Sequence, residues 1–281
     1  MKSNANNHEN IGSEKKGTLK NTFLWVREQV KCNFKGMLTY RAAMILQIVG
    51  MMVNNTGILL VWYIFFRLFG SVNGWSYSEM LGLMGFVAIV FGIAFTLGKG
   101  MRRISRKVTY GQIDTFLVLP KSVLWQVIFS EVEVSAVGDF FFGVLLLVLY
   151  AVVSSFGIGQ ILLLPLLVVF GVCSIAGFTI ATQSLAFWFP NTEDLSNSLF
   201  EFMLGPSLYP NSSFTGGVRF FFVFVIPAIV IGGLPVDILL RLDLRDVLLL
   251  VGLSAFWLVV GVVVFYRGLR RYESGNLVGV R

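Results

Sequence analysis

The chain has 281 residues, of which 56% are hydrophobic and only 13% are charged, and its formal net charge is +7. Soluble domains carry about a quarter charged residues, so this composition excludes an ordinary soluble domain and predicts an all-α integral membrane protein. We interpret the basic balance as the Lys and Arg excess of a membrane protein's cytoplasmic side, and expect no nucleic-acid partner.

Catalytic and metal-binding side chains are scarce. The chain has two cysteines, Cys32 and Cys173, and one histidine, His8, in a polar tail. This inventory predicts no zinc site of the usual kind, no cofactor and no catalytic base, so we expect no enzyme activity in this chain. The nearest approach to a phosphate-binding loop, GIAFTLGKG at 92–100, has the wrong spacing and lacks Ser or Thr after Lys99.

The N-terminal region divides into a polar, disordered tail at 1–18 and a segment at 19–41 that alternates apolar and basic residues. That alternation predicts an amphipathic helix lying in the membrane interface with its cations against anionic lipid headgroups. A solvated basic tail is the alternative. The first forty residues do not show the pattern of a cleavable signal peptide, so the first span is expected to direct insertion.

A single transmembrane domain is predicted over 42–266, followed by a cytoplasmic tail at 267–281. A span needs about 20 mostly apolar residues. Six stretches meet this requirement: 42–66, 80–98, 134–153, 161–189, 218–236 and 247–266.

Lys and Arg residues gather on one side of this topology. Eight lie in the tail through Arg41, six between Lys99 and Lys121, and four after residue 266, and Arg219 at the start of the fifth span is assigned to the same side. The other side receives a minority set of three: Arg67, Arg241 and Arg245. By the positive-inside rule, both termini are expected to be cytoplasmic. The expected location of the protein is the plasma membrane.

The third span is expected to be part of one helix over 122–153, about 48 Å long, whose cytoplasmic end protrudes and carries Glu131 and Glu133. Asp139 lies deeper, where a carboxylate facing lipid is costly. It is therefore predicted to face protein or water. An interfacial Asp that snorkels or pairs with a neighbouring Arg, and a role in transport, both remain open for it.

Small and polar residues recur at helical spacing in three spans. The stripes are Gln47, Gly50, Asn54 and Gly57; Gly82, Gly85 and Gly92; and Thr179, Thr182, Gln183 and Ala186. Close helix packing is the first interpretation, and a lined substrate pathway is the second. The candidate pathway residues are Gln47, Asn54, Asn55, Asp139, Thr179 and Gln183.

Pro227 interrupts the fifth predicted span and Pro235 lies at its outer end, with two glycines between them. Proline removes a backbone donor, so the outer half of this span is expected to bend or to re-enter the membrane. The following DILLRLDLRD, 237–246, is too short and too charged to span, and is expected to be an exposed interfacial segment.

The polar, basic stretch 99–122 links the second and third spans on the cytoplasmic side. Its part from Tyr110 to Pro120 is amphipathic and ends at a proline, after which a new helix begins. Apolar side chains and cations facing the cytosol suit either docking to a soluble partner or lying on the membrane surface.

Several short motifs, in their order along the chain, resemble the permease subunits of type-2 ABC exporters. They are LTYR (38–41), YGQIDTFLVLP (110–120), AFWF (186–189), YP (209–210), VIPAIVIGGLP (225–235) and GLRRYESGN (268–276). The resemblance covers nearly the whole chain from about residue 20.

The resemblance implies a dimer of permeases, either two copies or two relatives, above two ABC ATPase subunits that bind the ATP. It also implies that the loop after the second span docks on the ATPase through Tyr110, Gly111, Asp114, Phe116, Leu117 and Pro120. An acidic ATPase surface or anionic lipid would then be attracted electrostatically by Arg102, Arg103 and Arg106. The alternatives are an ion-gradient-driven secondary carrier, or a scaffold that transports nothing.

Overall fold

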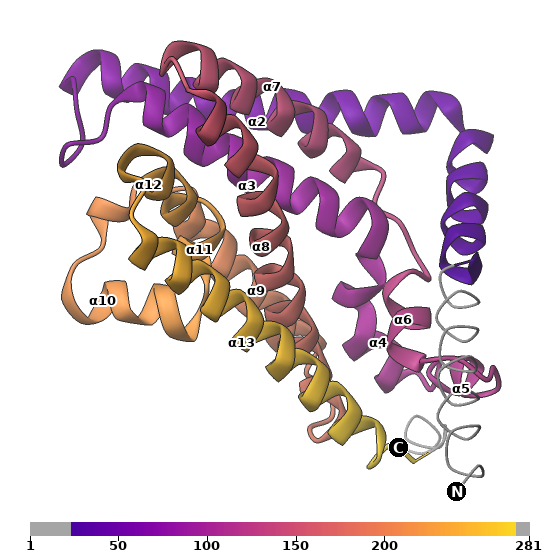
Figure 1. Cartoon of the computed structure of the whole chain (residues 1–281). Coiled ribbons are helices and arrows are strands. Elements are labelled where there is room, and N and C mark those ends of the chain that lie inside the picture. The colour runs from indigo at the N-terminus through magenta and orange to yellow at the C-terminus, as the bar shows by residue number, and fades with distance from the viewer. Residues whose placement is uncertain (1–23, 274–281) are drawn as a thin grey trace, which may run out of the picture.

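Helices make up nearly all of the computed structural model, which describes residues 24–273 (Figure 1). In chain order the first elements are helix 24–39, α2 (Arg41–Phe69), α3 (Tyr77–Gly98), the 3-10 turn η1 (Lys99–Arg103), α4 (Ile104–Thr109), α5 (Asp114–Leu117), α6 (Val123–Ile128), α7 (Ser135–Val153) and α8 (Ile158–Gln183). They are followed by η2 (Ser184–Phe187), α9 (Glu193–Ser207), η3 (Asn211–Ser213), α10 (Gly216–Phe220), the π-helical turn η4 (Phe221–Val225), α11 (Ala228–Ile231), α12 (Gly233–Arg241) and α13 (Leu244–Leu269).

Five of the described helices are long and apolar enough to cross a membrane: α2, α3, α7, α8 and α13, with α3 continuing into α4 and α8 into η2. They confirm five of the six predicted spans to within several residues. Residues 24–39 are helical, as expected for most of 19–41. Their position in the interface stays a prediction, and the predicted tail at 1–18 lies outside the described residues.

The main packing contacts join α3 to α7 and α8 to α13, while α2 lies against α7. Glycine allows the first pair to approach closely. A Cβ on Gly92 would collide with the backbone of Phe140, and one on Gly143 would collide with the backbone of Ile89. The predicted packing role of the glycine stripe in the second span is therefore confirmed.

The stripe in the first span behaves differently. A Cβ added to Gly50 or Gly57 would have no atom of the described chain within 4 Å, and Gln47 and Asn54 are exposed. Of an apolar stretch of 18 residues in α2, only 6% are buried within the chain. This face of α2 is thus covered by nothing within the described chain.

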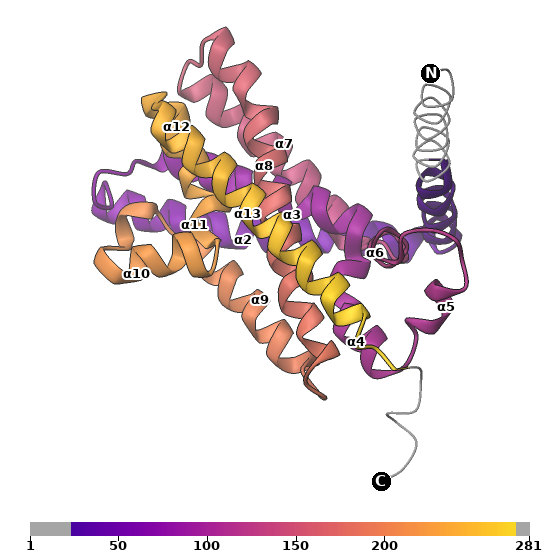
Figure 2. The same cartoon turned by 60° about the horizontal axis from the view of Figure 1, so that its bottom comes forward.

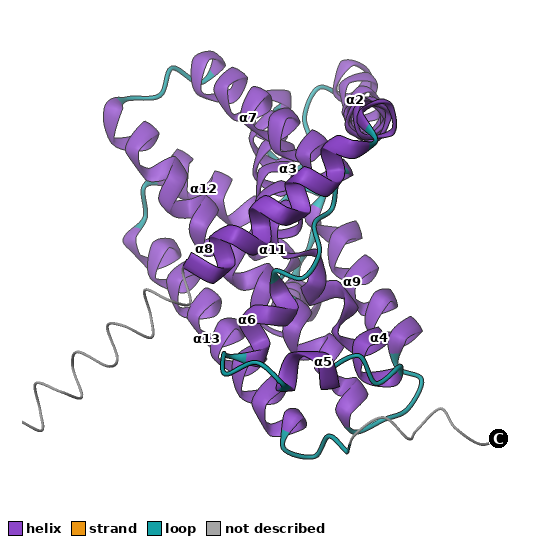
Figure 3. Cartoon of the chain, turned by 90° about the vertical axis from the view of Figure 1, so that its right-hand side faces the viewer, coloured by secondary structure: helices purple, strands orange, loops and turns teal. Residues whose placement is uncertain are grey.

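The molecule has two ends that differ in charge. The basic end holds η1, α4, α5 and α6 beside the C-terminal end of α13, where Ser122 Oγ lies 2.7 Å from Tyr266 Oη (Figure 3). The opposite end holds the loop after α2 together with α10 and α12 (Figures 1 and 2).

The third helix is not continuous, so the prediction of one helix over 122–153 is wrong. Residues 129–134 break it into α6 and α7. Glu131 and Glu133 lie in this break, where their carboxylates bind cations of the preceding segment. These ion pairs favour the break at 129–134 over a continuous helix.

The predicted fifth span at 218–236 is also wrong as a single helix, because the chain there divides into α10, η4, α11 and α12. Pro227 directly precedes α11, as the expected bend requires. The chain passes from the basic end to the opposite end through α9 and the residues after it instead. At the basic end Thr192 Oγ1 lies 3.5 Å from Ser105 Oγ, and at the opposite end Asn73 donates to the carbonyl of Ser212 over 3.3 Å.

Residues 216–241 therefore belong to the opposite end, as a folded-back segment. Phe222 packs on Phe214 with ring centroids 5.1 Å apart. Arg219 lines the same cavity as Arg241 and Arg245, so its grouping with the Lys and Arg residues of the basic end is wrong. These three arginines lie together at the opposite end of the molecule.

Candidate coupling site at the basic end

A short turn between α4 and α6 carries the residues that the resemblance selects. Gly111, at φ +68°, reverses the chain after α4, and α5 follows. Tyr110 is 57% exposed and Leu117 48% exposed, and Pro120 is also exposed. Phe116 is half-buried against the core, and Asp114 is neither fully buried nor exposed.

The apolar surface of this turn extends past α5. Val118 is 82% exposed and Leu119 45% exposed, both beyond the set that the sequence selected. Ile113, by contrast, is fully buried and anchors the turn to the core. Leu117, Val118 and Leu119 therefore form a small apolar tip on the turn, and the buried side chain of Ile113 anchors the turn to the core.

Gln126 in α6 supports this tip. Its side chain is fully buried, and its Nε2 donates to the carbonyl of Phe116 over 3.0 Å and to that of Lys121 over 3.1 Å. The last carbonyls of a helix have no donor within that helix, and the Gln126 amide supplies a donor to the carbonyl of Phe116 near the end of α5. Phe116 before the tip and Lys121 after it are thereby bound to the same side chain.

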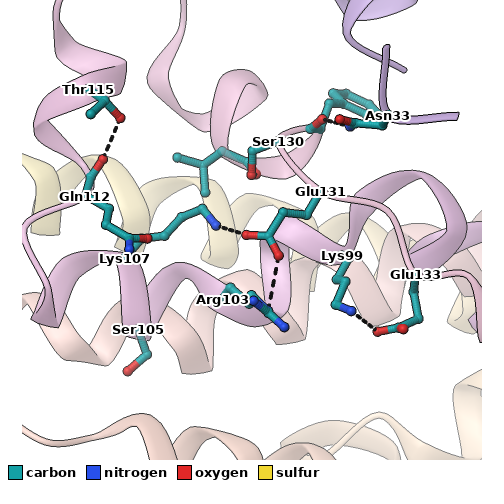
Figure 4. A network of polar contacts seen from close by, with 12 residues as sticks. Asn33, Lys99, Arg103, Ser105, Lys107, Gln112, Thr115, Ser130, Glu131 and Glu133 are labelled. Carbon is teal, nitrogen blue, oxygen red and sulfur yellow. Dashed lines mark hydrogen bonds and ion pairs between the residues drawn. The ribbon is translucent and has the colours of Figure 1, made fainter. Parts of the chain in front are cut away.

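Ion pairs connect α4 and η1 to the break in the third helix (Figure 4). Glu131 binds both Lys107 and Arg103, the latter over 3.2 Å, and Glu133 binds Lys99 over 2.7 Å. The side chain of Lys107 is only 5% exposed. Because two glutamates hold three cations across two chain segments, η1 and α4 form one charged joint with the break at 129–134.

The predicted steering cations are thus partly occupied within the chain. Arg103 belongs to this joint, while Arg102 stacks on the ring of Phe200, 3.9 Å from its centroid, and contacts Glu201 over 3.4 Å. Arg106 is exposed and lies 5.8 Å from the ring centroid of Tyr110. Arg106 therefore contacts the start of the turn, at Tyr110.

The N-terminal helix also docks here. Asn33 Nδ2 donates to the carbonyl of Phe129 over 3.0 Å, and Lys121 Nζ lies 5.3 Å from the ring centroid of Trp25. Helix 24–39, the break at 129–134 and the end of the tip therefore meet. Helix 24–39 leads into α2 and the break leads into α7, so a displacement of the tip would reach both of these helices.

The six candidate pathway residues occupy three places. Asn55 Nδ2 donates to Asp139 Oδ1 over 2.6 Å between α2 and α7. Gln183 accepts from the backbone of Ser105 over 3.3 Å, and the neighbouring Thr179 is fully buried. Gln47 and Asn54 lie exposed on α2. None of the six lines either of two cavities of about 980 and 800 Å³, and their role in a pathway stays a prediction.

A polar pair at the opposite end was missed by the sequence analysis. Asn211 Nδ2 donates to Asp237 Oδ2 over 2.7 Å, and both side chains are buried. Burial raises the pKa of Asp237, and the hydrogen bond from Asn211 opposes that rise. Gly233 lets Asn211 in, because a Cβ there would collide with its side chain. The expectation that 237–246 is wholly exposed is therefore wrong at its start, although the acidic residue inside an apolar run was a usable signal.

Within the described chain, no group of three or more His, Cys, Asp and Glu side chains could hold a metal ion. Residues 52–276 match the family described as ABC-2 family transporter protein. No curated protein and no solved structure matches the chain. The matched range includes all five spans except the first eleven residues of α2, and it includes the whole of the apolar tip.

Proposed function

Because this chain belongs to the ABC-2 transporter family and is a multi-pass membrane protein, we propose that it is the permease subunit of an ATP-driven exporter. It forms the substrate pathway in a dimer of permeases, and separate ATPase subunits bind and hydrolyse ATP below its basic end. The proposal places the protein in the plasma membrane with both termini in the cytoplasm, following the distribution of Lys and Arg.

One observation carries the coupling part of this proposal: an apolar tip projects from a charged joint at the basic end. Leu117 and Val118 are exposed, yet the backbone between them and α6 is held by Gln126. Exposed apolar side chains on a well-supported turn suit insertion into a cleft of another protein. Movement of the ATPases would then displace the tip as a rigid body and, through the ion pairs of Glu131, tilt α3 and α7.

The bare face of α2 supports the dimer. Gln47 and Asn54 are exposed there, and polar side chains facing lipid are costly. We therefore assign this face to the second permease, where the two amides would find partners or line the pathway.

The test is purification of the full chain from its native membranes with its bound partners. Leu117→Asp and Val118→Asp place charges on the tip and should each reduce the co-purified ATPase at least severalfold. Leu242→Asp is the matched control, because Leu242 is 60% exposed at the opposite end and has a left-handed backbone that Asp tolerates. Equal recovery of ATPase with all three variants would contradict the docking role.

A complete lack of ATPase in the wild-type preparation would contradict the exporter itself. Transport driven by an ion gradient and abolished by Asp139→Asn would then favour the secondary carrier. No transport under either condition would favour the scaffold.

A further inference from the structure

A cavity of about 980 Å³ opens at the end of the molecule opposite the candidate coupling site. Its walls come from the loop after α2, from α10 and η4, from α12 and from the start of α13. Cavities of this size are typical of small-molecule sites. Neither the family match nor the coupling argument gives it a role.

Three arginines line this cavity: Arg219 from α10, Arg241 from α12 and Arg245 from α13. All three are exposed, and within the described chain none has a carboxylate within 4.0 Å. Arginine side chains converge here from three elements that are separated in the sequence. Their guanidinium donors are thus available to a ligand.

The acidic side chains of the same cavity are mostly occupied. Glu79 accepts from the backbone of Ser76 over 2.5 Å, and Asp243 accepts from the backbone of Arg245 over 2.9 Å. Asp237 accepts from Asn211. Only Asp246 lacks such a donor in the described residues. These hydrogen bonds do not cancel the charges of the carboxylates, but they direct three of the four to donors within the chain, whereas the three guanidinium groups keep their donors free for a ligand.

Much of the remaining lining is apolar. Phe220 and Phe224, with ring centroids 4.8 Å apart, come from α10 and η4, and Leu248 and Leu249 come from α13. Phe220, Phe224 and Leu248 are exposed, so part of the apolar wall is open to the surroundings of the chain. A wall of this kind beside free guanidinium groups matches a ligand with one anionic group and one hydrocarbon part.

We propose that this cavity binds an anionic amphiphile that enters from the membrane, with its phosphate or carboxylate on the three arginines and its hydrocarbon chains along Phe220, Phe224 and Leu248. Guanidinium groups bind phosphate and carboxylate through paired hydrogen bonds, and lysine or a lone arginine would do so less well. The proposal depends on the membrane placement of the chain and not on ATP coupling. It therefore survives failure of the exporter proposal, and the reverse also holds.

The experiment measures equilibrium binding to the purified full-length protein in a neutral detergent. The probes are short-chain phosphatidylglycerol, phosphatidylcholine with the same chains, and glycerol phosphate. Phosphatidylglycerol should bind at least tenfold more tightly than either of the others, because only it combines a net negative headgroup with hydrocarbon. Equal binding of phosphatidylcholine would overturn the role of charge, and equal binding of glycerol phosphate would overturn the role of the hydrocarbon part.

Variants locate the site. The triple variant Arg219→Gln, Arg241→Gln, Arg245→Gln should weaken phosphatidylglycerol binding at least tenfold. Arg67→Gln is the control, because Arg67 ends α2 at the same end of the molecule but does not line the cavity. Phe224→Gln should weaken phosphatidylglycerol binding and leave glycerol phosphate binding unchanged. An Arg67→Gln effect as large as that of the triple variant would reduce the result to general surface charge and overturn the site.

Discussion

Asn55 Nδ2 donates a hydrogen bond of 2.6 Å to Asp139 Oδ1, and each residue is only 8% exposed. The pair joins α2 to α7 within the membrane domain, 84 residues apart in the sequence. Since α2 has few other buried residues, this bond is a main attachment of α2 to the rest of the chain. The carboxyl of Asp139 therefore has a structural partner, but this partner is the amide of Asn55 and not the neighbouring Arg that the sequence interpretation named.

The first prediction concerns the loss of one partner. Asn55→Leu should destabilise the protein by about 1–3 kcal/mol, because it leaves the buried carboxyl of Asp139 without its donor. The double variant Asn55→Leu, Asp139→Leu should recover most of that loss, since two apolar side chains can replace a buried polar pair. Thermal unfolding in detergent measures both. A double variant that is less stable than Asn55→Leu would show that Asp139 has a second, stronger partner.

The sequence predicted well those features that depend on one helix at a time. Apolar length located five spans, and the glycine at position 92 correctly indicated a close approach of α3 to another helix. Glycine spacing cannot say whether the partner lies in the same chain. For that reason the stripe with Gly50 and Gly57 was indistinguishable from one that packs within the chain.

The errors arose where a tertiary contact outweighs local preference. Hydropathy alone favours a continuous helix at Glu131 and Glu133. These two residues lie outside a helix because three cations of η1 and α4 bind them there. Likewise α9, which leads from the basic end toward the opposite end, has only 15 residues, about 22 Å of helix, and too little apolar character to be predicted as a span. The more apolar stretch at 218–236 was chosen instead, although its prolines correctly indicated a bend.

The second prediction concerns the charged joint. Glu131→Gln leaves the nearly buried ammonium of Lys107 without a counter-charge and should destabilise the protein by about 2 kcal/mol. Glu201→Gln is the matched control: its partner Arg102 lies 3.4 Å away and Glu201 is 61% exposed, so a loss of less than about 1 kcal/mol is expected. Thermal unfolding gives the stability. Stimulation of the co-purified ATPase by transport should fall only in Glu131→Gln, and an equal fall in both variants would argue against the joint.

The third prediction concerns Gly111, in the turn between α4 and α5 that precedes the apolar tip. Gly111 has φ +68°, where an ordinary L-residue costs about 1–2 kcal/mol. Gly111→Val should therefore distort the turn and lower the amount of ATPase recovered with the permease, while Gly111→Asn should retain it, because Asn adopts this backbone more readily. Both variants should insert normally into the membrane. Equal recovery with Val and Asn would show that the shape of the turn does not determine docking.

The fourth prediction uses two glycines of α13 that differ in their surroundings. Gly261 faces α8, and a Cβ there would collide with the carbonyl of Gly177, whereas a Cβ on Gly252 would have no neighbour within 4 Å. Gly261→Ala should therefore destabilise the protein by about 1–3 kcal/mol through overpacking, because backbone atoms cannot move aside as a flexible side chain would. Gly252→Ala should be neutral or stabilising by up to about 1 kcal/mol, since alanine is the better helix former. Thermal unfolding of the two variants in the same detergent compares them directly, and equal stability would mean that α8 and α13 pack less closely than the structure shows.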